Sequence, residues 1–279
     1  MADKKKRTHK FLNKHPFIGA LLGAAVFVAL FVITSSISSY VLKNFITDTD
    51  VYSSVGILIA FILSSLVFLW WFRGETNGLL FGGDIKGCAY IAGLFVAFWA
   101  LVLVQEHFTA AAHLEPVTAS VIGRAVSAGF FEEPLCRGFI LMLLFRKLRT
   151  PKKIIGAVLI TTLIFSLLHL PNAGSAGLLP TIRQTINAFG TGLAFSVLYV
   201  RSGNILPSTI LHTIHDIIAF ILTDSENLPV IFAGLKTADL INMILTLILG
   251  VLCFIYLRKD SVMEKIIAVW DKKWSGVVE

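Results

Sequence analysis

Long apolar stretches alternate with short polar connections along most of the chain. An apolar run of about 18 residues or more is typical of a helix that crosses a lipid bilayer. The pattern predicts eight spanning helices, at residues 16–42, 52–72, 88–104, 119–145, 153–170, 182–200, 204–222 and 238–257. We therefore expect an all-α fold, a polytopic transmembrane helical bundle.

The composition agrees with this fold class. Hydrophobic residues make up 56% of the 279 residues and charged residues 15%, which is too little polar surface for a soluble domain of this length. The three cysteines, Cys88, Cys136 and Cys253, lack the paired spacing of a zinc site or a disulfide framework. We interpret them as residues that pack between helices.

The distribution of positive charge predicts the orientation in the membrane. Most Lys and Arg residues lie at the two ends of the chain and in the connections after the second, fourth and sixth spans, whereas the other connections hold little more than Lys43 and Lys236. By the positive-inside rule both termini are cytoplasmic. Topology and attraction to an anionic inner leaflet explain the net charge of +7, so the expected partner is the lipid bilayer and not nucleic acid.

We expect one integral membrane domain at residues 16–257, with its motif core at 119–222. A basic cytoplasmic segment, 1–15, precedes it, and a basic cytoplasmic tail, 258–279, follows it. The first apolar stretch is too long for a signal peptide and is interpreted as a retained span. The tail is weakly amphipathic, and the sequence leaves open whether it lies on the inner membrane surface or is solvated and disordered.

Three charged residues fall inside the fourth predicted span: Glu132, Glu133 and Arg137. An ionised side chain in hydrocarbon costs at least about 2.5–3.5 kcal/mol, so such residues usually mark a site. Glu133 and Arg137 are spaced i, i+4 with the acid first, which favours an ion pair on one helix face. Glu132 is turned by about 100° from Glu133 and stays outside that pair. The alternative is one packed interhelical network of all three charges.

Further polar residues occur in two other spans. The fifth span ends with Phe165 and His169, and the seventh contains His212, Asp216 and, on a neighbouring face, His215. At about 1.5 Å per residue, Glu132, His169 and His212 reach similar depths near the middle of the membrane. Three helices could therefore bring these side chains into one polar cavity.

Two backbone features lie near this cavity. Pro134 lacks an amide proton and should kink or unwind the helix beside Glu132. The connection at residues 171–177 is rich in glycine and uncharged, and it is either a mobile edge that admits a substrate or an ordinary loop.

Taken in order, Glu132-Glu133-x-x-x-Arg137, Phe165-x-x-x-His169 and His212-x-x-x-Asp216 on three separate spans resemble the CPBP family of intramembrane proteases, also called the CAAX-protease, bacteriocin-processing or Abi family. The resemblance implies that Glu132 and His169 activate the water that attacks a peptide carbonyl. It further implies that His212 and the residue at Asp216 stabilise the oxyanion. Glu133 and Arg137 would form a structural ion pair.

The sequence leaves the question of a metal open. The family is often labelled a metalloprotease, and Glu132, His169, His212 and Asp216 supply oxygen and nitrogen ligands suited to zinc. The HExxH helix of familiar zinc proteases is absent, and we favour a metal-independent Glu/His mechanism. Since an ionised Asp216 cannot donate to an oxyanion, it must be protonated, orient His212 or bind metal. His215 is a further ligand, a proton relay or a residue that faces a neighbouring helix.

The function that the resemblance implies is that of an intramembrane endopeptidase acting on a hydrophobic or membrane-associated peptide. Two alternatives are a binding protein of the same family, for example one that confers bacteriocin immunity, and a proton-coupled transporter with a Glu/His relay. The absence of repeats and of paired broken helices disfavours the transporter. The resemblance to compact bacterial members suggests a bacterial plasma membrane. The sequence indicates neither the substrate's identity nor the oligomeric state.

Overall fold

The computed structural model describes residues 11, 14–73, 80–109, 112–114, 116–146, 150–224, 230–231 and 235–275. Its long helices are α2 (Pro16–Leu42), α3 (Thr49–Trp71), α5 (Ala89–Thr109), α6 (Ala119–Glu133), α8 (Pro151–Leu167), α10 (Leu178–Ser202), α11 (Ile205–Ile221), α12 (Thr237–Leu257) and α13 (Asp260–Ser275). Shorter helical segments are η1 (Ile85–Cys88), η2 (Pro134–Leu141), α7 (Met142–Arg146), η3 (Leu170–Asn172) and α9 (Ala173–Ala176). The predicted all-α membrane bundle is confirmed. Most of the predicted basic segment 1–15 lies outside the described residues.

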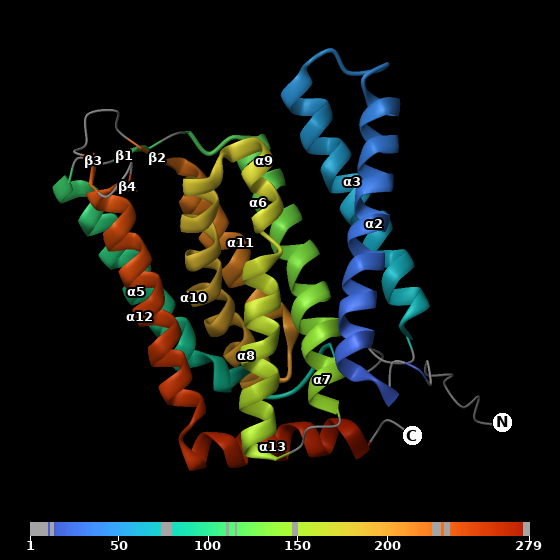
Figure 1. Ribbon diagram of the computed structural model, residues 1–279, viewed down its shortest axis with the longest axis vertical. Coiled ribbons are helices and arrows are strands. Elements are labelled where there is room, and N and C mark those ends of the chain that lie inside the picture. Colours follow the sequence, from blue (N-terminus) through green and yellow to red (C-terminus); the bar gives the residue numbers. More distant parts are fainter. Residues whose placement is uncertain are drawn as a thin grey trace.

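Strands are a minor part of the described chain. β1 (Ala112–Leu114) pairs antiparallel with β2 (Leu222–Asp224), and β3 (Val230–Ile231) pairs antiparallel with β4 (Leu235–Lys236). These short hairpin-like pairs lie at the upper end of the bundle in Figure 1, opposite the end that α13 crosses. They connect helices and form no layer of their own.

Helices correspond closely to the predicted spans, but the number of spans is not confirmed. By length and composition, four helical stretches of the described chain could cross a membrane: Pro16–Leu42, Ile85–Phe108, Pro151–Asn172 and Thr237–Leu257. Two apolar helices are shorter, at Val55–Trp71 and Ile205–Ile221. The fourth predicted span consists of α6, η2 and α7 in succession. Eight spans remain a prediction.

Helix α10 is the central element of the bundle. It contacts α8, α11, α12 and α13, and every residue from Gly190 to Ser202 is buried. Close packing against α12 depends on small residues, because a side chain at Gly190 would overlap the carbonyl oxygen of Thr246. At its end Gly203 adopts a left-handed conformation, φ 66°, which lets the chain turn directly into α11. The Asn204 side chain then caps α11 by accepting a hydrogen bond from the Leu206 amide at 3.0 Å.

The fourth predicted span changes its helical form at Pro134. The α-helix ends at Glu133, and η2 continues it as a π-helix of eight residues. Pro134 has no amide proton to donate to the preceding turn, which accounts for the change at this residue. Irregular backbone of this kind was predicted beside Glu132, and the π-helix is its observed form.

The C-terminal tail is neither disordered nor detached. Residues 260–275 form α13, which lies across the end of the bundle in Figure 1. Its apolar face buries Val262, Ile266 and Trp270, and the Trp270 indole donates a hydrogen bond to the Val200 carbonyl at 2.7 Å. Burial of this face explains why an amphipathic tail is helical here. The alternative of a solvated, disordered tail is wrong for these residues.

Candidate active site

Three buried side chains form a continuous polar chain inside the bundle. Arg137 Nη1 donates to Glu133 Oε1 at 2.8 Å, and both side chains are fully buried. The same oxygen of Glu133 lies 2.9 Å from Nδ1 of His212 on α11. Glu133 therefore joins its own helix to α11, in addition to pairing with Arg137. Sequence reasoning assigned Glu133 only the second of these contacts.

Arg137 is held from two sides. Its Nη2 donates to the carbonyl oxygen of Gly192 on α10 at 2.8 Å, and its guanidinium lies 4.4 Å from the ring centroid of Phe165 on α8. A side chain at Gly192 would lie 2.6 Å from the Phe165 ring, so this approach of α8 to α10 requires glycine. Ion pair, hydrogen bond and cation–π contact together compensate the burial of a charge in the bundle.

His212 is oriented by its ring contacts as well as by Glu133. The imidazole stacks on Phe195 of α10 with ring centroids 4.8 Å apart, and it meets Phe165 edge-on at 5.9 Å. Because the Glu133 carboxylate can only accept, Nδ1 of His212 carries the proton of that hydrogen bond. Nε2 then points away from Glu133, toward the other two carboxyl groups of the site.

Two carboxyl groups flank Nε2 of His212 at a common distance. Glu132 Oε2 and Asp216 Oδ1 each lie 3.7 Å from this nitrogen. That distance exceeds a direct hydrogen bond and leaves space for an intervening oxygen atom. The side chain of Glu132 is 25% exposed, in contrast to the fully buried Glu133. The two adjacent glutamates thus occupy different environments, as their helical offset predicts.

His169 follows the last residue of α8 and is half-buried. Its Nδ1 lies 3.1 Å from the carbonyl oxygen of Phe165, one turn earlier, and its ring meets the Phe165 ring edge-on. A carbonyl oxygen only accepts, so Nδ1 carries a proton and Nε2 of the neutral ring is an acceptor. Within the described chain no hydrogen bond or ion pair joins His169 directly to Glu132. His169 is within electrostatic range of Asp216.

Helices α6 and α11 approach each other closely beside the site. A side chain at Gly129, one turn before Glu133, would overlap the hydroxyl oxygen of Thr213, the residue after His212. Glycine at position 129 therefore sets the separation between the helix that carries the glutamates and the helix that carries His212 and Asp216.

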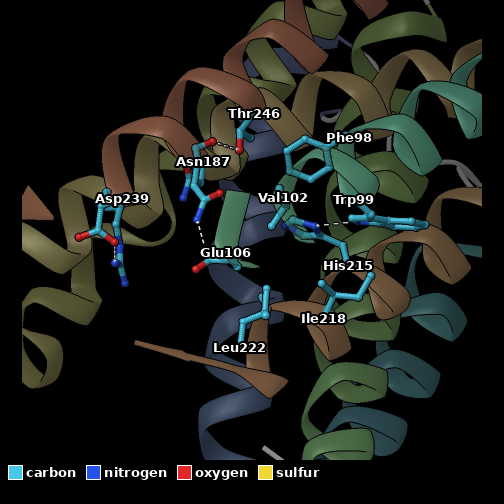
Figure 2. Close-up of a pocket in the computed structure, with 13 residues that line it drawn as sticks. Phe98, Trp99, Val102, Glu106, Asn187, His215, Ile218, Leu222, Asp239 and Thr246 are labelled. Carbon is cyan, nitrogen blue, oxygen red and sulfur yellow. Dashed lines mark hydrogen bonds and ion pairs between the residues drawn. The ribbon is translucent and has the colours of Figure 1, made fainter. Parts of the chain in front are cut away.

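His215 is directed away from this cluster. Trp99 of α5 donates its indole proton toward Nδ1 of His215 at 3.5 Å, and Phe98 packs against the imidazole with ring centroids 5.9 Å apart (Figure 2). The structure therefore favours the interpretation in which His215 faces a neighbouring helix. It lines a second cavity between α5, α10, α11 and α12.

The metal question can be compared with the ligand geometry. Glu132, His212 and Asp216 are chemically suitable donors. Within the described residues, however, no three His, Cys, Asp or Glu side chains are grouped closely enough to hold a metal ion. The described donors do not fit a preformed metal site, and we derive no chemical step through a metal.

Sequence reasoning missed the part of the site that α10 supplies. Gly192 and Phe195 contact Arg137 and His212, yet neither belongs to the motifs on the other three helices. The only local signal is the small-residue run Gly190-Thr191-Gly192, which is typical of close helix packing. The connection at 171–177 is mostly helical, as η3 and α9, and Asn172 bonds to Gln184 of α10 at 2.9 Å.

The fold and this buried Glu/Arg/His cluster define a helical membrane protein with an internal polar site. Residues 113–218 match the family described as Rce1-like, type II CAAX prenyl endopeptidase Rce1-like. This match confirms the resemblance to the CPBP and CAAX proteases, and the matched region contains all six predicted site residues. No curated protein matches the sequence.

Proposed function

We propose that this protein is an intramembrane endopeptidase that hydrolyses a peptide bond in a hydrophobic or membrane-associated peptide. The Rce1-like match indicates CAAX-type protease activity at the level of the family. The observation that carries the proposal is the arrangement around His212, whose Nε2 lies 3.7 Å from both Glu132 and Asp216 while Nδ1 is held by Glu133.

In this mechanism Glu132 is the general base. Its partly exposed carboxylate takes a proton from a water molecule, and the resulting hydroxide attacks the peptide carbonyl. His169, with Nδ1 committed to Phe165 and Nε2 available, assists in positioning this water and in transferring the proton to the leaving amine.

His212 and Asp216 stabilise the oxyanion in the same scheme. To donate from Nε2 while Nδ1 donates to Glu133, His212 must be an imidazolium. Two cations, Arg137 and His212, then balance two anions, Glu132 and Glu133, and the buried cluster is neutral when Asp216 is protonated. A protonated Asp216 supplies a second donor for the oxyanion.

An apolar groove between α2 and α8 supports entry of a substrate from the membrane. It has a volume of about 630 Å³, is lined by residues such as Val28, Ala29 and Ile164, and ends at Leu168, beside His169. A hydrophobic segment or a lipid modification on the substrate would fit such a surface better than a polar peptide. A bacterial plasma membrane with both termini cytoplasmic belongs to the same proposal, on the basis of the charge distribution.

The test is cleavage of a peptide library by the purified protein in lipid nanodiscs, with and without a chelator. The library contains matched peptides with and without a prenyl group. Glu132→Gln should abolish cleavage, whereas Glu264→Gln, which changes an exposed carboxylate of α13, should cleave like the parent. Equal cleavage by the Glu132 variant would overturn the proposal, and binding without turnover would favour the alternative of an immunity or scaffold protein.

A further inference from the structure

The second cavity lies on the other side of α11 from the Glu132 cluster. It has a volume of about 180 Å³ and is bounded by α5, α10, α11 and α12 (Figure 2). Its polar residues lie toward the strand end of the bundle: Glu106 is near the end of α5, Arg183 near the start of α10, and Asp239 near the start of α12. Trp99 and His215 form the deeper, aromatic part.

Hydrogen-bond acceptors predominate on the polar wall of this cavity. Asn242 donates its amide to Glu106 Oε1 at 2.9 Å, so the orientation of Asn242 is fixed and its Oδ1 is directed elsewhere. That oxygen and Oδ1 of Asn187 are buried, and neither has a hydrogen-bond partner among the described residues. Buried acceptors of this kind usually meet a donor, from water or from a ligand.

The charges of the lining are unequal. Asp239 is paired with Arg183, and Lys236 donates its backbone amide to the second oxygen of Asp239 at 3.2 Å. Glu106 is 93% buried, and among the side chains of the lining it is bonded to the neutral amide of Asn242. Counting Glu106, Asp239 and Arg183, the cavity carries one net negative charge, which favours a positively charged ligand.

We propose that this cavity binds a compact organic cation with N–H donors, such as an alkylammonium group. The ammonium would donate to Glu106, Asn187 and Asn242, and the ring of Trp99 would face the positive charge. A cavity of about 180 Å³ has room for several water molecules and is too large for a single bare ion, and the described residues contain no three-ligand metal group. Size and aromatic lining thus both favour an organic cation.

This site is independent of the proposed peptidase activity. His212 turns toward Glu133 of α6, whereas His215 on the same helix turns toward Trp99 of α5. Binding can therefore be measured without a peptide substrate, and failure of one proposal leaves the other testable.

The experiment is a titration of the purified full chain with propylammonium chloride, followed by thermal unfolding and calorimetry, with propanol at equal ionic strength as the neutral control. A ligand that binds only the folded state raises the melting temperature in a saturable manner. We expect this rise with propylammonium and none with propanol.

Two variants locate the site. Glu106→Gln keeps an acceptor for Asn242 and removes the charge, and it should weaken binding by at least about tenfold. Asn187→Ala, which removes a single acceptor, should weaken it severalfold and serves if the first variant does not fold. Asp48→Asn alters an exposed carboxylate between α2 and α3 and should bind like the parent. An equal rise with propanol, or parental binding by both cavity variants, would overturn the proposal.

Discussion

Glu133 Oε1 lies 2.9 Å from Nδ1 of His212, across the interface between the fourth predicted span and α11. This contact gives one fully buried carboxylate two partners on different helices, because Arg137 donates to the same oxygen at 2.8 Å. A residue that secondary-structure spacing assigns to a local ion pair therefore also orients the imidazole of the proposed active site.

Removal of Glu132 or His169 should separate activity from stability. We expect Glu132→Ala and His169→Ala to abolish peptide cleavage and to leave the melting temperature nearly unchanged, because both side chains are partly exposed and outside the Arg137 ion pair. Cleavage assays and thermal unfolding of the same preparations test this, with Glu264→Gln as the matched control. Parental turnover in the Glu132 variant would refute its assignment as the base.

Removal of Arg137 should act mainly on the fold. Arg137→Ala leaves the buried Glu133 carboxylate without its main counter-charge and the Gly192 carbonyl without its donor, at a cost of about 3–5 kcal/mol of unfolding free energy. Chemical unfolding in detergent measures the loss, and Arg258→Ala, at an exposed position after α12, is the control. If the Arg137 variant melted like the parent and lost only turnover, Arg137 would have to be reassigned to substrate binding.

The two residues of α11 should respond differently to substitution. His212→Ala should reduce turnover by about 10²–10³, the usual loss for one oxyanion donor. Asp216→Asn should retain substantial activity, because asparagine preserves the shape and supplies a donor.

A zinc titration of the Asp216→Asn protein distinguishes this mechanism from a metal-dependent one. A neutral amide is a weaker metal ligand than a carboxylate, so a metal enzyme would lose activity and regain it with added zinc. An inactive variant rescued by zinc would contradict the metal-independent mechanism.

Gly129 and Gly123 form a matched pair on α6. Gly129→Ala would place a methyl group against Thr213 and push α6 from α11, so we expect a stability loss of about 1–3 kcal/mol and a fall in turnover. Gly123 has open space at its Cβ position, and Gly123→Ala should be neutral or slightly stabilising. Similar behaviour of the two variants in unfolding and cleavage assays would argue against close packing at Gly129.

The ion pair between Asp84 and Arg201 predicts a pH dependence of stability outside the spans. Arg201 Nη1 donates to Asp84 Oδ2 at 2.9 Å, and this hydrogen bond lowers the pKa of the Asp84 carboxyl below its ordinary value. A lowered folded-state pKa contributes stability that is complete above the unfolded pKa and is lost as the pH falls below about 3.9. The difference in unfolding free energy between the parent and Asp84→Asn should therefore be constant near neutral pH and shrink in acid. A difference that grew on acidification would contradict this assignment.

Local information in the sequence was sufficient for the helices and for part of the site. Apolar run length and Pro16 place the start of α2 correctly, and the missing amide of Pro134 predicts an irregular helix beside Glu132. The i, i+4 spacing of Glu133 and Arg137 likewise predicts an ion pair that the structure contains. These features follow from periodicity and backbone chemistry, which act over a few residues.

Only the tertiary structure decided which helix faces meet. The second partner of Glu133, the stacking of Phe195 on His212 and the docking of Trp270 on Val200 join residues far apart in the chain. Helical periodicity states which residues share a face, but the choice of partner depends on how side chains of different helices interlock and where glycines allow close approach. For this reason the sequence determined the helices and the candidate residues, whereas packing around α10 determined the geometry that makes them one site.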